Sequence, residues 1–288
     1  KITGSFIAKI ITVVYILWLT LFLGLFVRYY GERMVSSIYP YTNISIFIII
    51  MLILVALVLH SGIVTLARMN EIILPIVAII TYFLIAFILP RVQIRKLTPI
   101  SYMDFVPVFN ASWGVTIVWG YLWYVFFIGD EINNKENIAV EGIKTAIFTT
   151  ITTILVTVAI VGSMGFSVAQ RTPFPFMTAV KLVSIFDILE KIESIVVVVW
   201  MFTDFITISF FTYISLKAIK QIFGLTDIKP IINVYMVFIY ILSMFLCNTR
   251  FELEEFSFKI ATPISIIGRL ALPSIILGIG LMRKKKTP

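Results

Sequence analysis

Charged residues and cysteine are scarce in this sequence. Charged residues make up 13% of its 288 residues, whereas a water-soluble domain carries about 25%. One cysteine, Cys247, and one histidine, His60, are present. A single cysteine excludes a disulfide within the chain and any metal site built from cysteines. A single histidine cannot supply a catalytic triad or a set of histidine metal ligands.

The short motifs of soluble enzymes are also missing. The sequence has no GxxxxGKS/T phosphate-binding loop, no HExxH zinc motif and no GxSxG nucleophile motif. Only one carboxylate, Asp204, lies deep inside an apolar stretch, which disfavours an intramembrane protease with paired aspartates. We therefore expect a protein that is not an enzyme and that has no catalytic residue, metal or cofactor.

Apolar residues fill the chain instead, at 60% of all residues and with a mean hydropathy of +1.06. They form blocks close to the ~20 residues that a helix needs to cross ~30 Å of hydrocarbon. Helices are expected rather than a barrel, because barrel strands show about ten residues of alternating polarity. Eight spans are predicted, at residues 10–27, 41–59, 72–89, 105–129, 145–164, 194–216, 231–248 and 263–282. Together they predict a single transmembrane helical domain over residues 1–288.

The net charge of +8 fits a membrane protein with basic ends in the cytoplasm. Eight spans place both termini on one side, and a basic cluster at residues 283–286 directly follows the last span. The basic residues of the loop at 217–229 agree with this orientation, whereas those of the loop at 90–104 oppose it. Because the last cluster is denser and adjoins the membrane, we expect cytoplasmic termini. The basic charge is explained by this topology, so no nucleic-acid partner is expected.

A short pattern recurs in two of the spans. The pattern KIxxxVxxxW runs from Lys9 to Trp18 and again from Lys191 to Trp200. A Leu-Pro pair also occurs in both the third and the eighth span. Spans one to three would then correspond to spans six to eight. Since an odd number of crossings separates the two copies, they would insert in opposite directions, as in an inverted repeat.

The repeat leaves the fourth and fifth spans without partners. We therefore predict a transporter-like, five-plus-five inverted-repeat helical bundle whose first two helices would precede Lys1. The alternative is a chance match among apolar residues.

The fourth span is long and contains helix-breaking residues. Its 25 uncharged residues would extend about 38 Å as a straight helix, and they include Pro107, Gly114 and Gly120. The first helix of each repeat is broken near the midplane in such transporters, where free backbone groups bind the solute. We predict a break within residues 114–120, with residues 117–119 lining it. A kinked or tilted structural helix is the alternative.

Asp204 is the main candidate for chemistry. A carboxylate about ten residues into a span costs several kcal/mol unless it is paired, protonated or hydrated. Thr203 and Thr207 share its helix face approximately, so their oxygens could help to hold an ammonium group, a proton or a cation. A small buried water cluster is the alternative. Arg269 is expected to reach the interface from one end of the last span and to be structural.

Several stretches resemble the B subunits of GerA-type spore germinant receptors. They include Phe174-Pro175, Leu-Glu-Lys-Ile-Glu-Ser at 189–194, Lys-Gln-Ile-Phe-Gly-Leu at 220–225, Leu-Ala-Arg at 66–68, Glu-Ile-Ile-Leu-Pro at 71–75 and Leu-Thr-Pro-Ile at 97–100. The resemblance covers essentially the whole chain. Its motifs are diffuse, but their order and spacing are similar to those of the family.

The resemblance implies ten helices in the amino acid/polyamine/cation transporter fold, in the inner membrane of the bacterial endospore. Family members act with an A subunit and a lipoprotein C subunit, bind a nutrient germinant such as an amino acid, and catalyse no reaction. Their pocket involves helices one, three, six and eight, of which the first would be absent here. The matching positions are Tyr15, Leu19, Ile117, Val118, Trp119, Gly120, Thr203, Asp204 and Thr207.

Two positions depart from the family's pattern and bear on which ligand would bind. Tyr121 follows Gly120 where many members have a carboxylate, and Asp204 lies near the place of a basic residue. The preferred hypothesis is a nutrient germinant receptor B subunit that triggers germination with A and C subunits in a lipid membrane. The alternatives are a proton-coupled secondary amino-acid transporter that uses Asp204, and a nonfunctional fragment.

Overall fold

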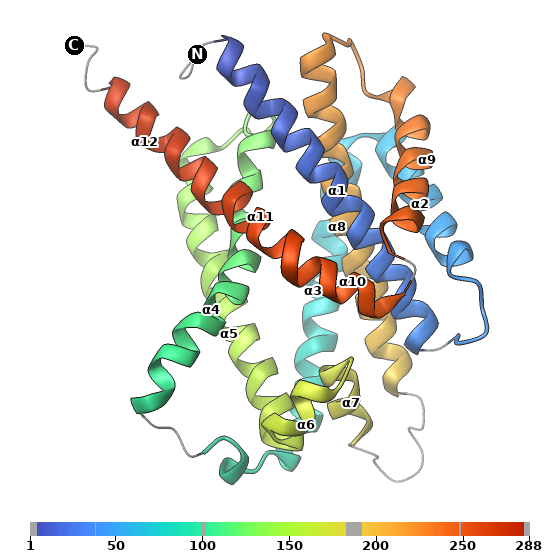
Figure 1. The fold of residues 1–288 in the computed structure, drawn as a ribbon, viewed down its shortest axis with the longest axis vertical. Coiled ribbons are helices and arrows are strands. Elements are labelled where there is room, and N and C mark those ends of the chain that lie inside the picture. Colours follow the sequence, from blue (N-terminus) through green and yellow to red (C-terminus); the bar gives the residue numbers. More distant parts are fainter. Residues whose placement is uncertain (1–4, 38, 99–101, 183–191, 248, 285–288) are drawn as a thin grey trace. The chain divides into compact units, whose positions relative to one another are not determined.

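The described part of the chain is built from helices and their connections. The computed structural model describes residues 5–37, 39–98, 102–182, 192–247 and 249–284, and no strand occurs among them (Figure 1). The long apolar blocks explain this result, because a helix satisfies the hydrogen bonds of its backbone within its own segment, where hydrocarbon offers no other partner. The prediction of an all-α protein is therefore confirmed.

Six long helices dominate the structure, and shorter ones connect them. The long helices are α1 (Ser5–Ser37), α2 (Ile44–Ser61), α3 (Ile63–Ile88), α5 (Ile138–Met164), α8 (Ile192–Phe223) and α9 (Lys229–Leu246). The connecting helices are η1 (Leu89–Arg91), η2 (Ile94–Lys96), η3 (Tyr102–Asp104), η5 (Lys135–Asn137), α6 (Phe166–Arg171) and α7 (Pro175–Lys181).

The last helical run is interrupted by two π-helical turns. It comprises α10 (Arg250–Phe256), η6 (Ser257–Ala261), α11 (Thr262–Ile266), η7 (Ile267–Ala271) and α12 (Leu272–Lys284). This run begins well before residue 263, the predicted start of the last span. The predicted basic cluster at residues 283–286 lies outside the described side chains, so the orientation of the chain in the membrane stays a prediction.

Seven helical segments of the described chain are long and apolar enough to cross a membrane. They are Phe6–Ser37, Ile44–Ser61, Ile63–Arg91, Lys135–Met164, Ser194–Phe223, Lys229–Leu246 and Arg250–Ile279. The fourth predicted span, at residues 105–129, does not form one uniform helix. It is divided into α4 (Phe105–Trp119) and a 3-10 helix, η4 (Gly120–Ile128), and each part is shorter than a span.

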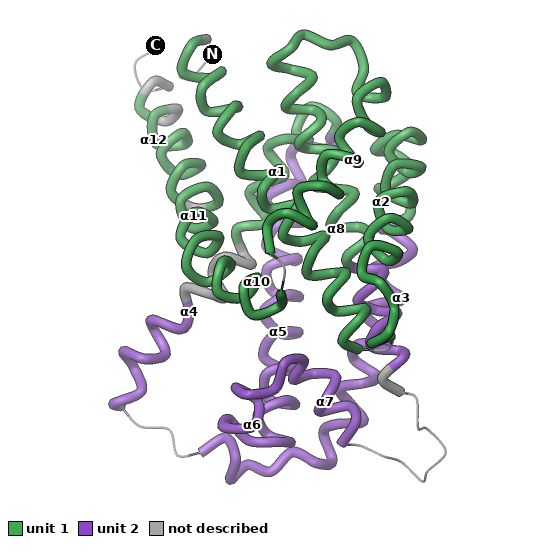
Figure 2. Tube along the Cα trace, turned by 45° about the vertical axis from the view of Figure 1, so that its right-hand side comes forward, with its two compact units in different colours: residues 1–69, 114–131, 204–288 green, residues 70–113, 132–203 purple. Residues whose placement is uncertain are grey.

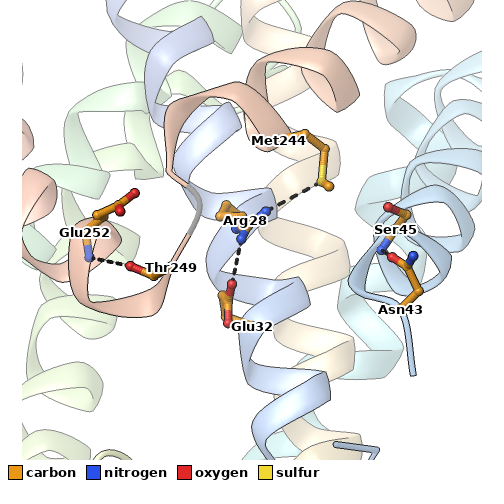
Figure 3. A network of polar contacts seen from close by, with 7 residues as sticks. All are labelled: Arg28, Glu32, Asn43, Ser45, Met244, Thr249 and Glu252. Atoms are coloured by element: carbon orange, nitrogen blue, oxygen red, sulfur yellow. Dashed lines mark hydrogen bonds and ion pairs between the residues drawn. The ribbon is translucent and has the colours of Figure 1, made fainter. Parts of the chain in front are cut away.

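Local capping fixes several helix ends. The Asn43 side chain accepts a hydrogen bond from the Ser45 backbone N–H at 2.9 Å and so caps the start of α2. Thr249 caps α10 in the same way by accepting from the Glu252 N–H (Figure 3). Gly62 separates α2 from α3 with a φ of 94°, a conformation that favours glycine.

The chain divides into two compact units, each made of segments distant in sequence (Figure 2). Unit 1 contains residues 1–69, 114–131 and 204–288, and unit 2 contains residues 70–113 and 132–203. In unit 1, α1 packs against α2 and α9, and α2 packs against α9. The fully buried apolar side chains of unit 1 include Leu19, Leu23, Ile48, Ile208, Ile214, Ile232 and Ile239.

Within unit 1, α1 and α8 run in opposite directions. The rings of Phe22 and Phe211 lie 5.1 Å apart, and Arg33 contacts Asp204 further along α1 but earlier along α8. An inverted repeat requires this antiparallel orientation of the two helices. Superposition of the first three spans on the last three stays a prediction.

Hydrogen bonds and a ring contact join neighbouring helices within unit 2. The hydroxyl groups of Tyr82 on α3 and Thr152 on α5 lie 2.6 Å apart. The Gln93 N–H donates to the Gly162 carbonyl at 3.0 Å, which fastens the connection after η1 to the end of α5. The rings of Phe174 and Trp200 pack at 5.4 Å and join the start of α7 to α8.

Candidate functional site

Arg269 is a buried charge in the middle of the last helical run of unit 1. Its residue exposure is 2%, so the expectation that it would reach the interface is wrong. The reason is the length of the run: it begins at Arg250, which places Arg269 far from both ends. An arginine at this depth requires specific stabilisation by its neighbours.

Aromatic rings surround the Arg269 guanidinium. Its Cζ atom lies 4.4 Å from the ring centres of Phe22 and Tyr121, and 5.9 and 6.0 Å from those of Trp18 and Tyr124. The electron-rich ring faces attract the cation, an effect of about 2 kcal/mol where water is excluded. We call Arg269 and these four aromatic residues the Arg269 cluster.

Tyr124 links two members of the Arg269 cluster by hydrogen bonds. Arg269 Nε and Trp18 Nε1 each donate to the Tyr124 hydroxyl oxygen at 3.4 Å. Phe211 of α8 packs against the cluster, with its ring centre 4.8 Å from that of Tyr124. The cluster therefore joins α1, η4 and η7, and Phe211 adds a contact with α8; these elements are far apart in sequence.

Gly120 allows the segments of the cluster to approach closely. A Cβ atom added to Gly120 would lie 2.7 Å from the Cβ atom of Arg269, a distance that real side chains do not adopt. A Cβ atom on Gly268 would lie 3.5 Å from the Trp18 ring, which is ordinary van der Waals contact. Gly120, predicted from the sequence as a ligand position, thus lies directly against Arg269.

Tyr15 contacts the same part of the last helical run. Its hydroxyl donates to the Gly268 carbonyl at 3.0 Å, and its ring meets the Phe127 ring edge-on at 5.3 Å. Gly268 belongs to the π-helical turn η7 that carries Arg269. Irregular turns of this type occur often at functional sites. The structure therefore brings Tyr15, Gly120 and η7 together.

Asp204 forms a second buried charged site. It is 3% exposed, and Arg33 Nη1 lies 3.2 Å from Oδ2 and 3.4 Å from Oδ1 of its carboxylate. The sequence indicated that Asp204 needed a partner but did not identify Arg33. Unit 1 thus contains an ion pair between α1 and α8 in addition to the Arg269 cluster.

The structure describes the side chains of three further predicted positions, Thr203, Thr207 and Leu19. Thr203 belongs to unit 2, and its exposed hydroxyl donates to the Val199 carbonyl at 3.1 Å and to the Trp200 carbonyl at 2.9 Å. Thr207 is half-buried, and Leu19 is fully buried in the apolar core. The side chains of Ile117, Val118 and Trp119 lie outside the described part of the chain.

The predicted break within residues 114–120 takes another form. The chain is α-helical from Phe105 through Trp119 and becomes a 3-10 helix at Gly120. No unwound segment occurs at residues 114–119, so the prediction of free backbone groups there is wrong. A change of hydrogen-bonding pattern at the last residue of this window places Tyr121 and Tyr124 beside Arg269.

The end of η4 is fastened to α8 by charged groups. Lys217 Nζ lies 2.5 Å from Asp130 Oδ1 and 2.6 Å from Glu131 Oε1. The Tyr213 hydroxyl donates to the same Glu131 oxygen at 2.5 Å. These contacts fix the far end of the segment that carries Tyr121.

The interior of unit 1 also contains polar groups between apolar neighbours. The hydroxyls of Ser209 and Thr212 on α8 are fully buried and meet no hydrogen-bonding group among the described residues. Arg28 of α1 is 4% exposed and donates to Glu32 at 2.8 Å and to the Met244 sulfur at 3.6 Å (Figure 3).

Long apolar helices around buried charges define a class, the multi-pass helical membrane proteins with a polar interior. A comparison with protein families then identifies the group to which the chain belongs. It is a member of the spore germination protein family, whose model matches residues 1–269. The resemblance predicted from the sequence is thereby confirmed. No curated protein and no solved structure matched the chain.

Proposed function

We propose that this chain is the B subunit of a nutrient germinant receptor in the inner membrane of the bacterial endospore. It binds a small solute such as an amino acid and triggers germination together with an A and a C subunit. The observation that carries the proposal is the family match over residues 1–269. The chain acts as a sensor in this proposal and performs no chemical conversion.

Two features of unit 1 support solute binding. The Arg269 cluster and the Arg33–Asp204 pair both bury charge, which is costly in a membrane and is retained where it serves function. Both also include residues of α1, so a solute that changes either contact acts on the same helix. A solute that favours one arrangement of these helices shifts the population of receptor states and so transmits its presence.

The experiment compares spores that lack this gene with spores complemented by the full-length gene. Germination is followed as loss of optical density over a panel of single nutrients at graded concentrations. The proposal expects loss of response to at least one nutrient in the deletion strain and its return on complementation. Equal responses of both strains to every nutrient would contradict it.

A parallel measurement tests the alternative of a proton-coupled transporter. The purified full-length protein is placed in liposomes, and uptake of the active nutrient is measured with and without a proton gradient. The receptor proposal expects no uptake above that of empty liposomes. Uptake that depends on the gradient and is lost in Asp204→Asn would favour the transporter instead.

A further inference from the structure

We propose that the Arg269 cluster binds the carboxylate of a small solute such as an amino acid. This inference rests on the proposed function, because it names the chemical group by which the receptor recognises its germinant. It assigns the ligand to η7, η4 and α1, whereas the sequence predicted a site at residues 114–120 that did not include Arg269.

The geometry of the guanidinium supports carboxylate binding. The rings of Phe22 and Tyr121 attract the cation through their faces, with centres 4.4 Å from Cζ. The five N–H donors of arginine lie in the guanidinium plane, and this planar fork matches a carboxylate with two parallel hydrogen bonds. At Arg269, Nε donates to Tyr124, and a further side-chain hydrogen bond links the guanidinium to Tyr121. Cation–π contacts and carboxylate binding are therefore compatible at Arg269.

Tyr124 supplies a second donor at the same place. Its oxygen already accepts from Arg269 and Trp18, so its own proton is directed elsewhere. Tyr124 is 2% exposed, and the hydrogen bonds of its hydroxyl among the described residues are the two that it accepts. A bound carboxylate provides the acceptor. Charged hydrogen bonds of this kind contribute more than neutral ones, especially where water is excluded.

The surroundings of Arg269 limit the solute and connect it to the helices. Phe22 and Phe211 form an apolar wall, which disfavours a large polar side chain. Arg269 lies on η7 and directly against Gly120, where α4 changes to η4. A carboxylate that draws the guanidinium towards itself therefore acts on the π-helical turn η7. It also acts on the change of helix type at Gly120.

The test uses the full-length protein in lipid nanodiscs. The probes are the twenty amino acids and the matching amino-acid amides, which keep the ammonium group but lack the carboxylate. Binding is measured as the rise in melting temperature over a concentration series. We expect at least one amino acid to stabilise the wild type, and its amide to bind about tenfold or more weakly.

Variants then assign the effect to the Arg269 cluster. Arg269→Gln and Arg269→Lys should weaken binding of the active amino acid about tenfold or more, and Tyr124→Phe should weaken it less. The matched control is Arg28→Gln, which removes another buried arginine of unit 1 that is paired with Glu32. This control should keep the wild-type affinity.

Three outcomes would overturn the inference. They are a wild type that no amino acid stabilises, an amide that binds as tightly as its acid, and a folded Arg269→Gln protein with unchanged affinity. The comparison of acid with amide uses the wild type alone, so it holds even if a variant fails to fold. Spores that still require the gene for a nutrient response would then preserve the proposed function while the carboxylate site is rejected.

Discussion

The Asp204 carboxylate of α8 and the Arg33 guanidinium of α1 form an ion pair at 3.2 Å inside unit 1. The Asp204 side chain is 4% exposed and that of Arg33 is 22% exposed, so water reaches only one side of the pair. The pair lies between two antiparallel helices, and any change in their separation alters it. It is therefore both a structural contact and a position where a solute could act.

Asp204→Asn should lower the free energy of unfolding by breaking this pair. Loss of one partner from a fully buried pair costs about 3–5 kcal/mol, but partial hydration of Arg33 should reduce the cost to about 1–3 kcal/mol. The measurement is the melting temperature of the purified protein. The double variant with reversed charges, Arg33→Asp with Asp204→Arg, should recover part of the loss.

Germination assays separate structural and binding roles of Asp204. If the carboxylate only holds α1 to α8, the reversed pair should restore the half-maximal nutrient concentration together with stability. If it also contacts the solute, stability should return while the response stays weakened. An unchanged melting temperature in Asp204→Asn would show that the ion pair does not stabilise the fold.

Gly120→Ala should destabilise the protein because its new Cβ would lie 2.7 Å from that of Arg269. Forcing an extra carbon into a packed interior costs about 1–3 kcal/mol, and here it would also displace the Arg269 cluster. The matched control is Gly142→Ala on α5, where nothing lies within 4 Å of the added carbon. Thermal unfolding should therefore separate the two variants, and equal melting temperatures would refute the close packing at Gly120.

The sequence predicted the elements of the fold better than their contacts. The apolar blocks identified the long helices because the thickness of a bilayer sets a minimum length for a span. The glycines of residues 105–129 indicated an interruption within 114–120, and the helix type does change at Gly120, but as a 3-10 helix and not as an unwound segment. The close approach of Gly120 to Arg269 is a contact between segments distant in sequence, which no local pattern indicates.

The candidate site was predicted only in part, for a related reason. Tyr15 and Gly120 were named from the family resemblance, and both lie near Arg269 in the structure. Arg269 itself was assigned to the interface because the start of its helix was placed too late. The signal that would have indicated a buried Arg269 is its distance from both ends of the helical run that begins at Arg250. The partner of Asp204 is 171 positions away, and no local pattern links it to Arg33.

Tyr15→Phe should test the contact between α1 and the π-helical turn η7. The variant loses the hydroxyl that donates to the Gly268 carbonyl at 3.0 Å but keeps the ring that packs on Phe127. We expect a loss of about 1 kcal/mol in the free energy of unfolding. The control is Tyr39→Phe, at a residue that is 53% exposed, which should be neutral. A Tyr15→Phe protein as stable as the wild type would argue against this hydrogen bond.

Lys217→Met should loosen the 3-10 helix that carries Tyr121 and Tyr124. Lys217 fastens the end of η4 to α8 through Asp130 and Glu131, at 2.5 and 2.6 Å. Its side chain is 22% exposed, so we expect a modest loss of about 1 kcal/mol in stability and a clearer local effect. Without the lysine, the two carboxylates repel each other and the end of η4 is released.

Hydrogen exchange of the backbone amides in Gly120–Ile128 measures that local effect, because faster exchange reports opening of the segment. The matched control is Lys144→Met, which removes an exposed lysine paired with Glu141 at 2.7 Å and should leave exchange in η4 unchanged. High salt should weaken the protection of η4 in the wild type, since part of the contact is open to water. Exchange in η4 that is equally slow in Lys217→Met and in the wild type would show that packing around Arg269, and not the lysine, holds the segment in place.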